Sequence, residues 1–390
     1  MRKAYLYELG SVITGNTPPK KKKEYYMNSD ISFVKPDDLP YRQSINFLNN
    51  SKCYISFCAK DKARIAPKKS ILVTCIGIIG KIAIVNKNEV AFNQQINAII
   101  PNEKVIDHRY LAYLLLFNRK KLNFIANAPI VPIINKSDFS NFKVKIHDDI
   151  MSQQKIADSL DLASSLIEKR KEQLEAMDQL IQSVFYEMFG DPVVNDKNWE
   201  MFNLSNLGEL GRGVSKHRPR NDEKLLGGEY PLIQTGDIAN SYIYIYDYKS
   251  TYSKLGLEQS KLWRKGTLCI TIAANIAKTG ILTFNSCFPD SVVGFIANEK
   301  TNSIFINVWF SFFQEIIENS APESAQKNIN LKILSNLSVI APPIDLQNKF
   351  ASIVEEIEAQ KKVMEESLQE MENNFNALMQ KAFKGELFPE

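Results

Sequence analysis

The fold is decided by residues 156–188, which read IADSLDLASSLIEKRKEQLEAMDQLIQSVFYEM. Apolar residues recur along this stretch at alternating steps of four and three, the a/d pattern of a helix that packs against another helix. Nine of the ten a/d positions are apolar, and Arg170 is the exception. Gly190 and Pro192 follow, and these residue types commonly end helices.

A second stretch with the same pattern covers residues 350–382, which read FASIVEEIEAQKKVMEESLQEMENNFNALMQKA, and here Lys361 is the exception. Because each helix has one apolar stripe, we expect an antiparallel coiled-coil rod with a globular head at either end. Each stripe would span about 48 Å at ~1.5 Å per residue. A polar a/d residue often fixes the register of a coiled coil, so we assign Arg170 and Lys361 structural roles. The predicted interface residues are Ile156, Leu160, Ile167, Leu174, Met177, Ile181, Phe350, Val354, Ile357, Met364, Leu368 and Phe375.

The rest of the chain is also repeated once. Leu9–Gly15 aligns with Leu207–Gly213, and the apolar run 70–85 aligns with 267–283. Alternating β-branched and aromatic residues between turn residues favour strands with a few helices. We therefore predict two α/β or α+β domains whose strand order the sequence does not give. The predicted boundaries are a first head at 1–150, a helix at 151–190, a second head at 197–343 and a helix at 344–390.

Charge follows the same repeat. Residues 1–150 contain 24 Lys and Arg against 12 Asp and Glu, whereas residues 151–196 contain 4 against 9. Residues 197–343 contain 15 against 13, and residues 344–390 contain 5 against 10. Basic or neutral heads that alternate with acidic helices are typical of a nucleic-acid-binding protein with non-binding connectors.

Several function classes are disfavoured by what the sequence lacks. No apolar run is long enough to span a membrane, and the N-terminus lacks the apolar core of a signal peptide. Five scattered cysteines and three histidines have no metal-ligand spacing, so we expect a cytoplasmic protein with reduced thiols and no metal.

Catalytic motifs are not found either. The Pro-Pro pairs at Pro18 and Pro342 lack the flanking residues of an amino-methyltransferase loop. The segment 77–82 is too short for a phosphate-binding loop, and neither Pro-Asp pair begins a nuclease motif. We therefore expect that the chain by itself is not an enzyme.

Binding chemistry is more visible. A loop between Gly211 and Asn221 contains five basic or imidazole side chains and no acidic residue, and these are Arg212, Lys216, His217, Arg218 and Arg220. Such groups can contact phosphates, and an arginine can bind guanine through two hydrogen bonds. The alternative is a solvated basic loop. Lys20, Lys21, Lys22 and Lys23 occupy the matching place in the first half.

Amides and other polar groups inside apolar stretches are further candidates, because amides pair with adenine edges. Buried amides also satisfy backbone groups, so this assignment stays open. The candidates are Gln234, Thr235, Asp237 and Asn240 in the second half, and Asn93, Gln94, Gln95 and Asn97 in the first. Lys278 and Lys35 complete the DNA-binding set.

Taken together, these residues resemble the specificity subunits of Type I restriction-modification enzymes over nearly the whole chain. The first head lacks the Arg-Gly-Val-Ser loop of the second and so departs further from the family pattern. The segments that carry the resemblance are Gly211–Arg220, Thr271–Ile276, Phe288–Phe295, Gln153–Ala157, Leu346–Phe350 and Phe383–Leu387.

The resemblance implies two target-recognition domains, each reading one half of a split site in double-stranded DNA, with the helices setting the spacer. It also implies two docked methylase subunits and added restriction-translocase subunits, with S-adenosylmethionine, ATP and Mg²⁺ on those partners and none on this chain. Two other functions remain open. One is a coiled-coil scaffold that recruits proteins without a DNA role, and the other, disfavoured by the missing motifs, is a stand-alone DNA-modifying enzyme.

Overall fold

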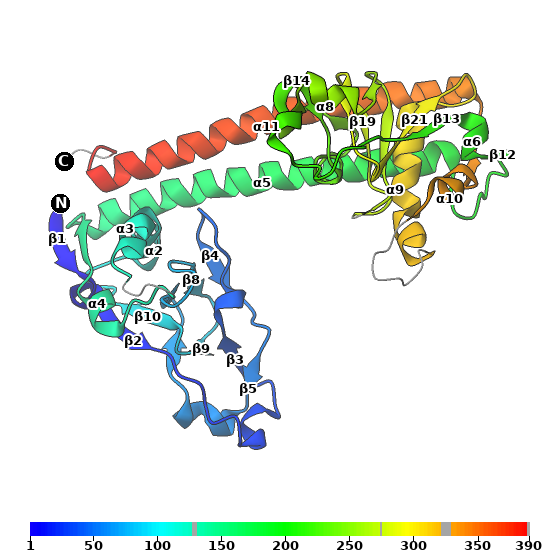
Figure 1. Cartoon of the computed structure of the whole chain (residues 1–390). Coiled ribbons are helices and arrows are strands. Elements are labelled where there is room, and N and C mark those ends of the chain that lie inside the picture. The colour runs from blue at the N-terminus through cyan, green and yellow to red at the C-terminus, as the bar shows by residue number, and fades with distance from the viewer. Residues whose placement is uncertain (127–130, 274, 321–328, 388–390) are drawn as a thin grey trace. The chain divides into compact units, whose positions relative to one another are not determined.

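Two compact units make up the chain (Figure 1). The computed structural model describes residues 1–126, 131–273, 275–320 and 329–387, with the backbone alone at 315–320. The first unit comprises Met1–Lys171 and Glu366–Glu390, and the second comprises Glu172–Glu365. Each unit therefore contains one head and a part of each long helix.

The first head is built on a five-stranded sheet in the order β2-β10-β7-β8-β4. These strands are β2 (Gly10–Thr14), β10 (Ile96–Pro101), β7 (Ile71–Thr74), β8 (Ile82–Val85) and β4 (Asn46–Leu48). A four-stranded sheet follows the order β5 (Tyr54–Ile55), β3 (Ile31–Val34), β9 (Glu89–Phe92) and β6 (Ile65–Pro67), and β1 (Arg2–Tyr5) pairs with β11 (Lys143–Ile146). The helices are α1 (Leu6–Leu9), η1 (Lys23–Tyr26), η2 (Pro36–Asp38), η3 (Phe57–Lys62), α2 (His108–Phe117), α3 (Arg119–Phe124) and α4 (Lys136–Ser140).

The second head repeats this topology strand for strand, with the five-stranded order β13-β21-β18-β19-β15. These strands are β13 (Gly208–Arg212), β21 (Val292–Ala297), β18 (Leu268–Thr271), β19 (Thr279–Leu282) and β15 (Tyr244–Ile245). The four-stranded sheet is β16 (Ser250–Tyr252), β14 (Leu226–Leu232), β20 (Ser286–Cys287) and β17 (Leu262–Trp263), and β12 (Met201–Asn203) pairs with β22 (Ser338–Ile340). The helices are α6 (Leu204–Leu207), η4 (Glu223–Leu225), α7 (Thr235–Ala239), α8 (Lys254–Glu258), α9 (Ser303–Ser320) and α10 (Leu331–Ser335). The predicted mixed α/β class and the sequence repeat are confirmed.

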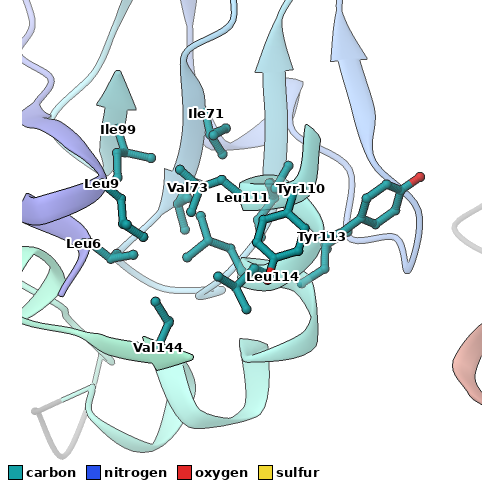
Figure 2. Close-up of a cluster of buried hydrophobic side chains, with 14 of the residues drawn as sticks. Leu6, Leu9, Ile71, Val73, Ile99, Tyr110, Leu111, Tyr113, Leu114 and Val144 are labelled. Atoms are coloured by element: carbon teal, nitrogen blue, oxygen red, sulfur yellow. The ribbon is translucent and has the colours of Figure 1, made fainter. Parts of the chain in front are cut away.

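The core of the first head lies between the five-stranded sheet and α2 (Figure 2). All four residues of β7 and all four of β8 are buried, which explains why these segments read as unbroken apolar runs. The Asp107 side chain accepts hydrogen bonds from the backbone N–H groups of Arg109 and Tyr110 in the first turn of α2 and so fixes where this helix begins. Leu6, Val73 and Leu111 are among the side chains that converge in this core.

The two long helices are α5 (Ile150–Phe189) and α11 (Ile344–Lys384). In the first unit, Ile156 and Leu160 near the start of α5 share a core with Phe375 near the end of α11. In the second unit, Ile181 near the end of α5 shares a core with Phe350 near the start of α11. The helices therefore pair antiparallel, as predicted. Of the predicted interface residues, Leu174, Met177, Met364 and Leu368 are half-buried and the others are buried.

Lys361 has a structural role in the second unit. Its side chain is 9% exposed, and its ammonium lies 2.5 Å from a carboxylate oxygen of Asp178 on α5 and 2.9 Å from one of Glu358. It also lies 4.5 Å from the ring centroid of Tyr242. A buried charge needs such partners, so the polar a/d position ties α11 to α5 in one register.

Two glutamines anchor the heads to the long helices. Gln153 of α5 accepts a hydrogen bond from the Asp107 backbone N–H and donates to the backbone oxygens of Val105 and His147. Gln347 occupies the repeat-equivalent position in α11. It accepts from Asn302 and Thr301 and donates to the oxygens of Lys300 and Pro342. Both side chains are fully buried.

Replacing Gln347 by Leu should destabilise the second unit by roughly 3 kcal/mol, since several buried backbone groups would lose their partners at about 1 kcal/mol or more each. The matched control is Gln360→Leu, which changes an exposed residue of the same helix and should shift the free energy of unfolding by less than about 0.5 kcal/mol. Urea unfolding monitored by circular dichroism measures both. Equal effects of the two substitutions would show that Gln347 does not anchor the head.

Candidate nucleic-acid interface

The candidate residues of each head gather at one end of its five-stranded sheet. In the second head, Thr271 at the end of β18 pairs with Val292 at the start of β21, and Arg212 at the end of β13 pairs with Val293. The loop after β13, the turn between β18 and β19 and the segment before β21 therefore meet there. Thr74 and Thr14 pair with β10 in the same way in the first head.

Asp290 organises the basic loop of the second head. Its backbone oxygen accepts a hydrogen bond from Nε of Arg212 at 2.5 Å. Its carboxylate accepts from Arg220 and lies 3.6 Å from the guanidinium of Arg218. The loop sequence contains no acidic residue, and the carboxylate that pairs with it belongs to Asp290, 70 positions after Arg220. One carboxylate faces two guanidinium groups, which leaves the cluster positive.

Further contacts hold the loop backbone while leaving its side chains accessible. Gln259 accepts hydrogen bonds from the backbone N–H groups of Lys216 at 2.7 Å and His217 at 3.1 Å. The imidazole of His217 lies 3.2 Å from a carboxylate oxygen of Asp222. The hydrogen bond from the Lys224 backbone N–H lowers the pKa of Asp222, and the contact with His217 lowers it further. Lys216, Arg218 and Arg220 all have exposed side chains.

The polar candidates around α7 lie beside this loop, because the Ile233 N–H bonds to the Cys287 oxygen just before the Asp290 segment. Gln234 and Asn240 cap the two ends of α7 with exposed side chains, and Thr235 is half-buried. Asp237 uses its carboxylate to accept from the Gln234 N–H at 2.9 Å. Lys278 ends the turn after β18, where its N–H bonds to the Thr271 hydroxyl.

Lys20, Lys21, Lys22 and Lys23 occupy the corresponding loop of the first head, all exposed. The chain enters this loop at Gly15, where an added Cβ would lie 2.1 Å from the Asn93 oxygen, and Gly213 of the second head meets the Pro289 oxygen in the same way. Gln94 stands where the second head has Asp290, and its amide oxygen accepts from the Thr17 hydroxyl at 2.7 Å. The backbones of the two loops are therefore held in equivalent ways, and the first head has the Gln94 amide where the second has the Asp290 carboxylate.

The remaining candidates of the first head divide by exposure. Gln94 and Lys35 are exposed, whereas Asn93 is buried and closes its turn by hydrogen bonds with Gln95. Asn97 is buried and accepts from the Thr14 hydroxyl at 2.6 Å. The Lys35 ammonium lies 2.9 Å from the sulfur of Cys53, and this hydrogen bond helps to raise the pKa of Lys35. Which of these groups contacts DNA stays a prediction.

The arrangement suits the binding of an anionic ligand. Exposed lysines and arginines lie at the same sheet end in both heads, with amides between them. In the described parts of the chain, His, Cys, Asp and Glu form no group that could hold a metal ion. Among the described residues, no helix is both long and apolar enough to cross a membrane.

The sequence profile of the Type I restriction modification DNA specificity domain matches the chain twice, at residues 3–176 and 196–373. The chain belongs to this family. It is similar to the MjaIX specificity subunit of Methanocaldococcus jannaschii, with 26% identity over 89% of this chain and 84% of that protein. It is also 32% identical to the HindI specificity subunit of Haemophilus influenzae, over 36% of this chain and 30% of that one.

Two solved structures have a similar fold. One is a chain from a study of complex assembly and conformational transition in the type I restriction-modification system, with a TM-score of 0.64, 16% identity and coverage of 99% of this chain and 98% of that one. The other is the S subunit from M. genitalium, with a TM-score of 0.58, 14% identity and coverage of 98% and 96%. The protein is a DNA sequence recognition subunit of this family, and the scaffold without a DNA role has no support.

The sequence analysis did not single out Asp290 and Gln259, although both contact the basic loop. Asp290 lies in a Pro-Asp pair without nuclease residues and within the segment Phe288–Phe295, and Gln259 lies in no motif. A signal that pointed to Asp290 was its position in the repeat, where it aligns with the candidate Gln94.

Replacing Arg218 and Arg220 together by Ala should weaken the dependence of DNA affinity on salt, because each lost phosphate contact lowers the logarithmic slope by about 0.9. We expect the slope to fall by one to two units in fluorescence-anisotropy titrations at several salt concentrations. The matched control is Lys265→Ala with Lys300→Ala, which removes two exposed charges at the opposite sheet end. If both double variants change the slope equally, the effect is one of net charge and the loop is not an interface.

Proposed function

We propose that each head recognises one half of a bipartite site in double-stranded DNA, and that the paired helices set the number of unread base pairs between the halves. The observation that carries this proposal is the equivalence of the two heads. Each head has its own five-stranded sheet with the same strand order, and each presents an exposed basic loop at the equivalent end of that sheet. Two similar readers with different side chains suit a site with two different halves.

We further propose that the chain assembles with two methylase subunits and with restriction-translocase subunits. S-adenosylmethionine, ATP and Mg²⁺ then bind to those partners, and the chain itself supplies no catalytic group. Apolar side chains on the outer surfaces of the long helices support a protein contact there. Leu162 and Leu166 of α5 are 64% and 48% exposed, and Val363 of α11 is 66% exposed.

Exchanging residues 1–150 for the head of a relative should change one half of the methylated site and leave the other half and the spacer intact. The incoming head must keep aromatic residues at Tyr110, Tyr113 and Phe117, because these rings pack against Phe375 and Phe383 of α11. Methylation mapping of the assembled complex measures the outcome. A chimaera that alters both halves would contradict independent reading.

Lengthening both helices by seven residues should lengthen the spacer. Suitable points lie between Gln173 and Leu174 and between Ser367 and Leu368, which are repeat-equivalent. One heptad keeps both stripes in phase and adds about 10.5 Å at ~1.5 Å per residue, which corresponds to roughly three base pairs at ~3.4 Å each. Affinity will also change, since three base pairs rotate one half-site by about a third of a turn.

The same methylation mapping reads the spacer directly. A control with two residues inserted in α5 alone breaks the a/d register and should lower stability before it alters the spacing. A stable and active seven-residue variant with the original spacer would refute the role of the helices as a ruler.

A further inference from the structure

The first unit contains a cavity of about 600 Å³ beside α11, and none of the DNA-binding candidates lines it. The loop Tyr41–Gln43, the junction of α2 and α3 and the residues Asn376 and Gln380 of α11 surround it. All of these residues belong to the first unit.

Three cations line this cavity, and among the described residues that line it none is acidic. They are Arg42 from the loop and Arg119 and Lys120 from α3. Arg42, whose side chain is 59% exposed, lies 3.8 Å from a carboxylate oxygen of Glu168. Amides of Gln43, Asn376 and Gln380 add neutral donors. This donor set, rich in N–H groups and positive charge, fits an anion with several oxygens.

Arg119 is fixed in place with hydrogen-bonding capacity left over. Its guanidinium lies 4.4 Å from the ring centroid of Tyr41 and donates to the Arg42 backbone oxygen at 2.6 Å. Its Nε is buried and has no hydrogen-bond partner among the described residues. Burial lowers the pKa of Arg119, and a nearby anion would offset this desolvation. An unsatisfied buried donor in a cationic cavity is costly unless a ligand accepts from it.

The second unit differs at the corresponding place. The repeat equivalents of Phe117, Met379 and Gln380 are Phe312, Phe185 and Tyr186. The ring centroid of Phe312 lies 4.9 Å from that of Phe185 and 4.8 Å from that of Tyr186. Aromatic rings thus pack together in the second unit where cations and amides line the cavity of the first.

The cavity adjoins the interface of the first head. Gly80, in the turn after β7, packs so closely on Arg119 that an added Cβ would lie 2.8 Å from its Cγ. The next residue, Lys81, donates from its ammonium to the Pro36 oxygen at 3.0 Å, and Pro36 follows the candidate Lys35. Basic side chains thus continue from Lys35 through Lys81 to Arg119.

We propose that Arg42, Arg119 and Lys120 bind a backbone phosphate of the DNA. The duplex would then contact the first unit beside α11 as well as the loops at the sheet end of the first head. The proposal rests on the proposed function and adds a contact to it. A phosphate suits the site better than a side-chain carboxylate, because it offers more oxygens to three cations and it comes with the ligand that the adjoining surface binds.

The test is a methylphosphonate scan, in which phosphates in and beside the half-site of the first head are made neutral one at a time. Anisotropy titrations use the chain assembled with its methylase subunits. At one DNA position, we expect the neutral phosphate to weaken binding by the wild-type protein. The same neutral phosphate should not weaken binding by the double variant Arg42→Gln with Lys120→Gln. This double variant leaves the stacked Arg119 in place, and it should lower the salt slope by about 0.9, the value for one phosphate.

A matched control, Lys104→Gln with Lys145→Gln, removes two exposed charges of the same head away from the cavity. This control variant should lose affinity at the same neutralised phosphate as the wild type. If the variant Arg42→Gln with Lys120→Gln also loses affinity there and has the wild-type salt slope, the phosphate site is overturned while the proposed function stands. Loss of methylase binding with unchanged DNA binding also overturns it, in favour of a partner's carboxylate. A wild-type complex that binds no specific duplex overturns the proposed function as well.

Discussion

The structure depends on the pairing of α5 with α11, because neither head completes its core without both helices. The core of the first head includes Ile156 and Leu160 from α5 together with Phe375 and Phe383 from the end of the chain. The core of the second head includes Phe185 from α5 and Phe350 from α11. The first unit is thus closed by the distant segment Glu366–Glu390, whereas the second unit is the continuous stretch Glu172–Glu365. In both units, formation of the helix pair and closure of the head are coupled.

The two heads differ in their exposed side chains and still share one frame. The apolar stripes, the glutamines Gln153 and Gln347 and the strand order are the same in both halves. The two halves differ at the sheet ends and at the cavity. Asp290 contacts arginines in the second head, where the first head has Gln94 bonded to the Thr17 hydroxyl. Aromatic rings pack together in the second unit at the place where cations line the cavity of the first.

Local patterns predicted those parts of the structure that local physics controls. The heptads of α5 and α11 follow from the spacing of apolar residues, and the buried strands β7 and β8 follow from unbroken apolar runs. The exposed basic loops followed from composition and turn residues. The role of Gln153 and Gln347 was not predicted, because their partners at Val105 and Lys300 lie about 47 residues away.

What the sequence by itself determined is the repeat, the two antiparallel helices and the absence of a catalytic motif, since each follows from spacing or residue type along the chain. The tertiary structure alone decided the strand order and the contacts of each basic side chain. Those contacts join residues such as Arg220 and Asp290, or Arg119 and Tyr41, that are 70 or more positions apart. Several loops that are distant in the sequence end at the same end of the sheet, so their charged side chains become neighbours only when the chain folds.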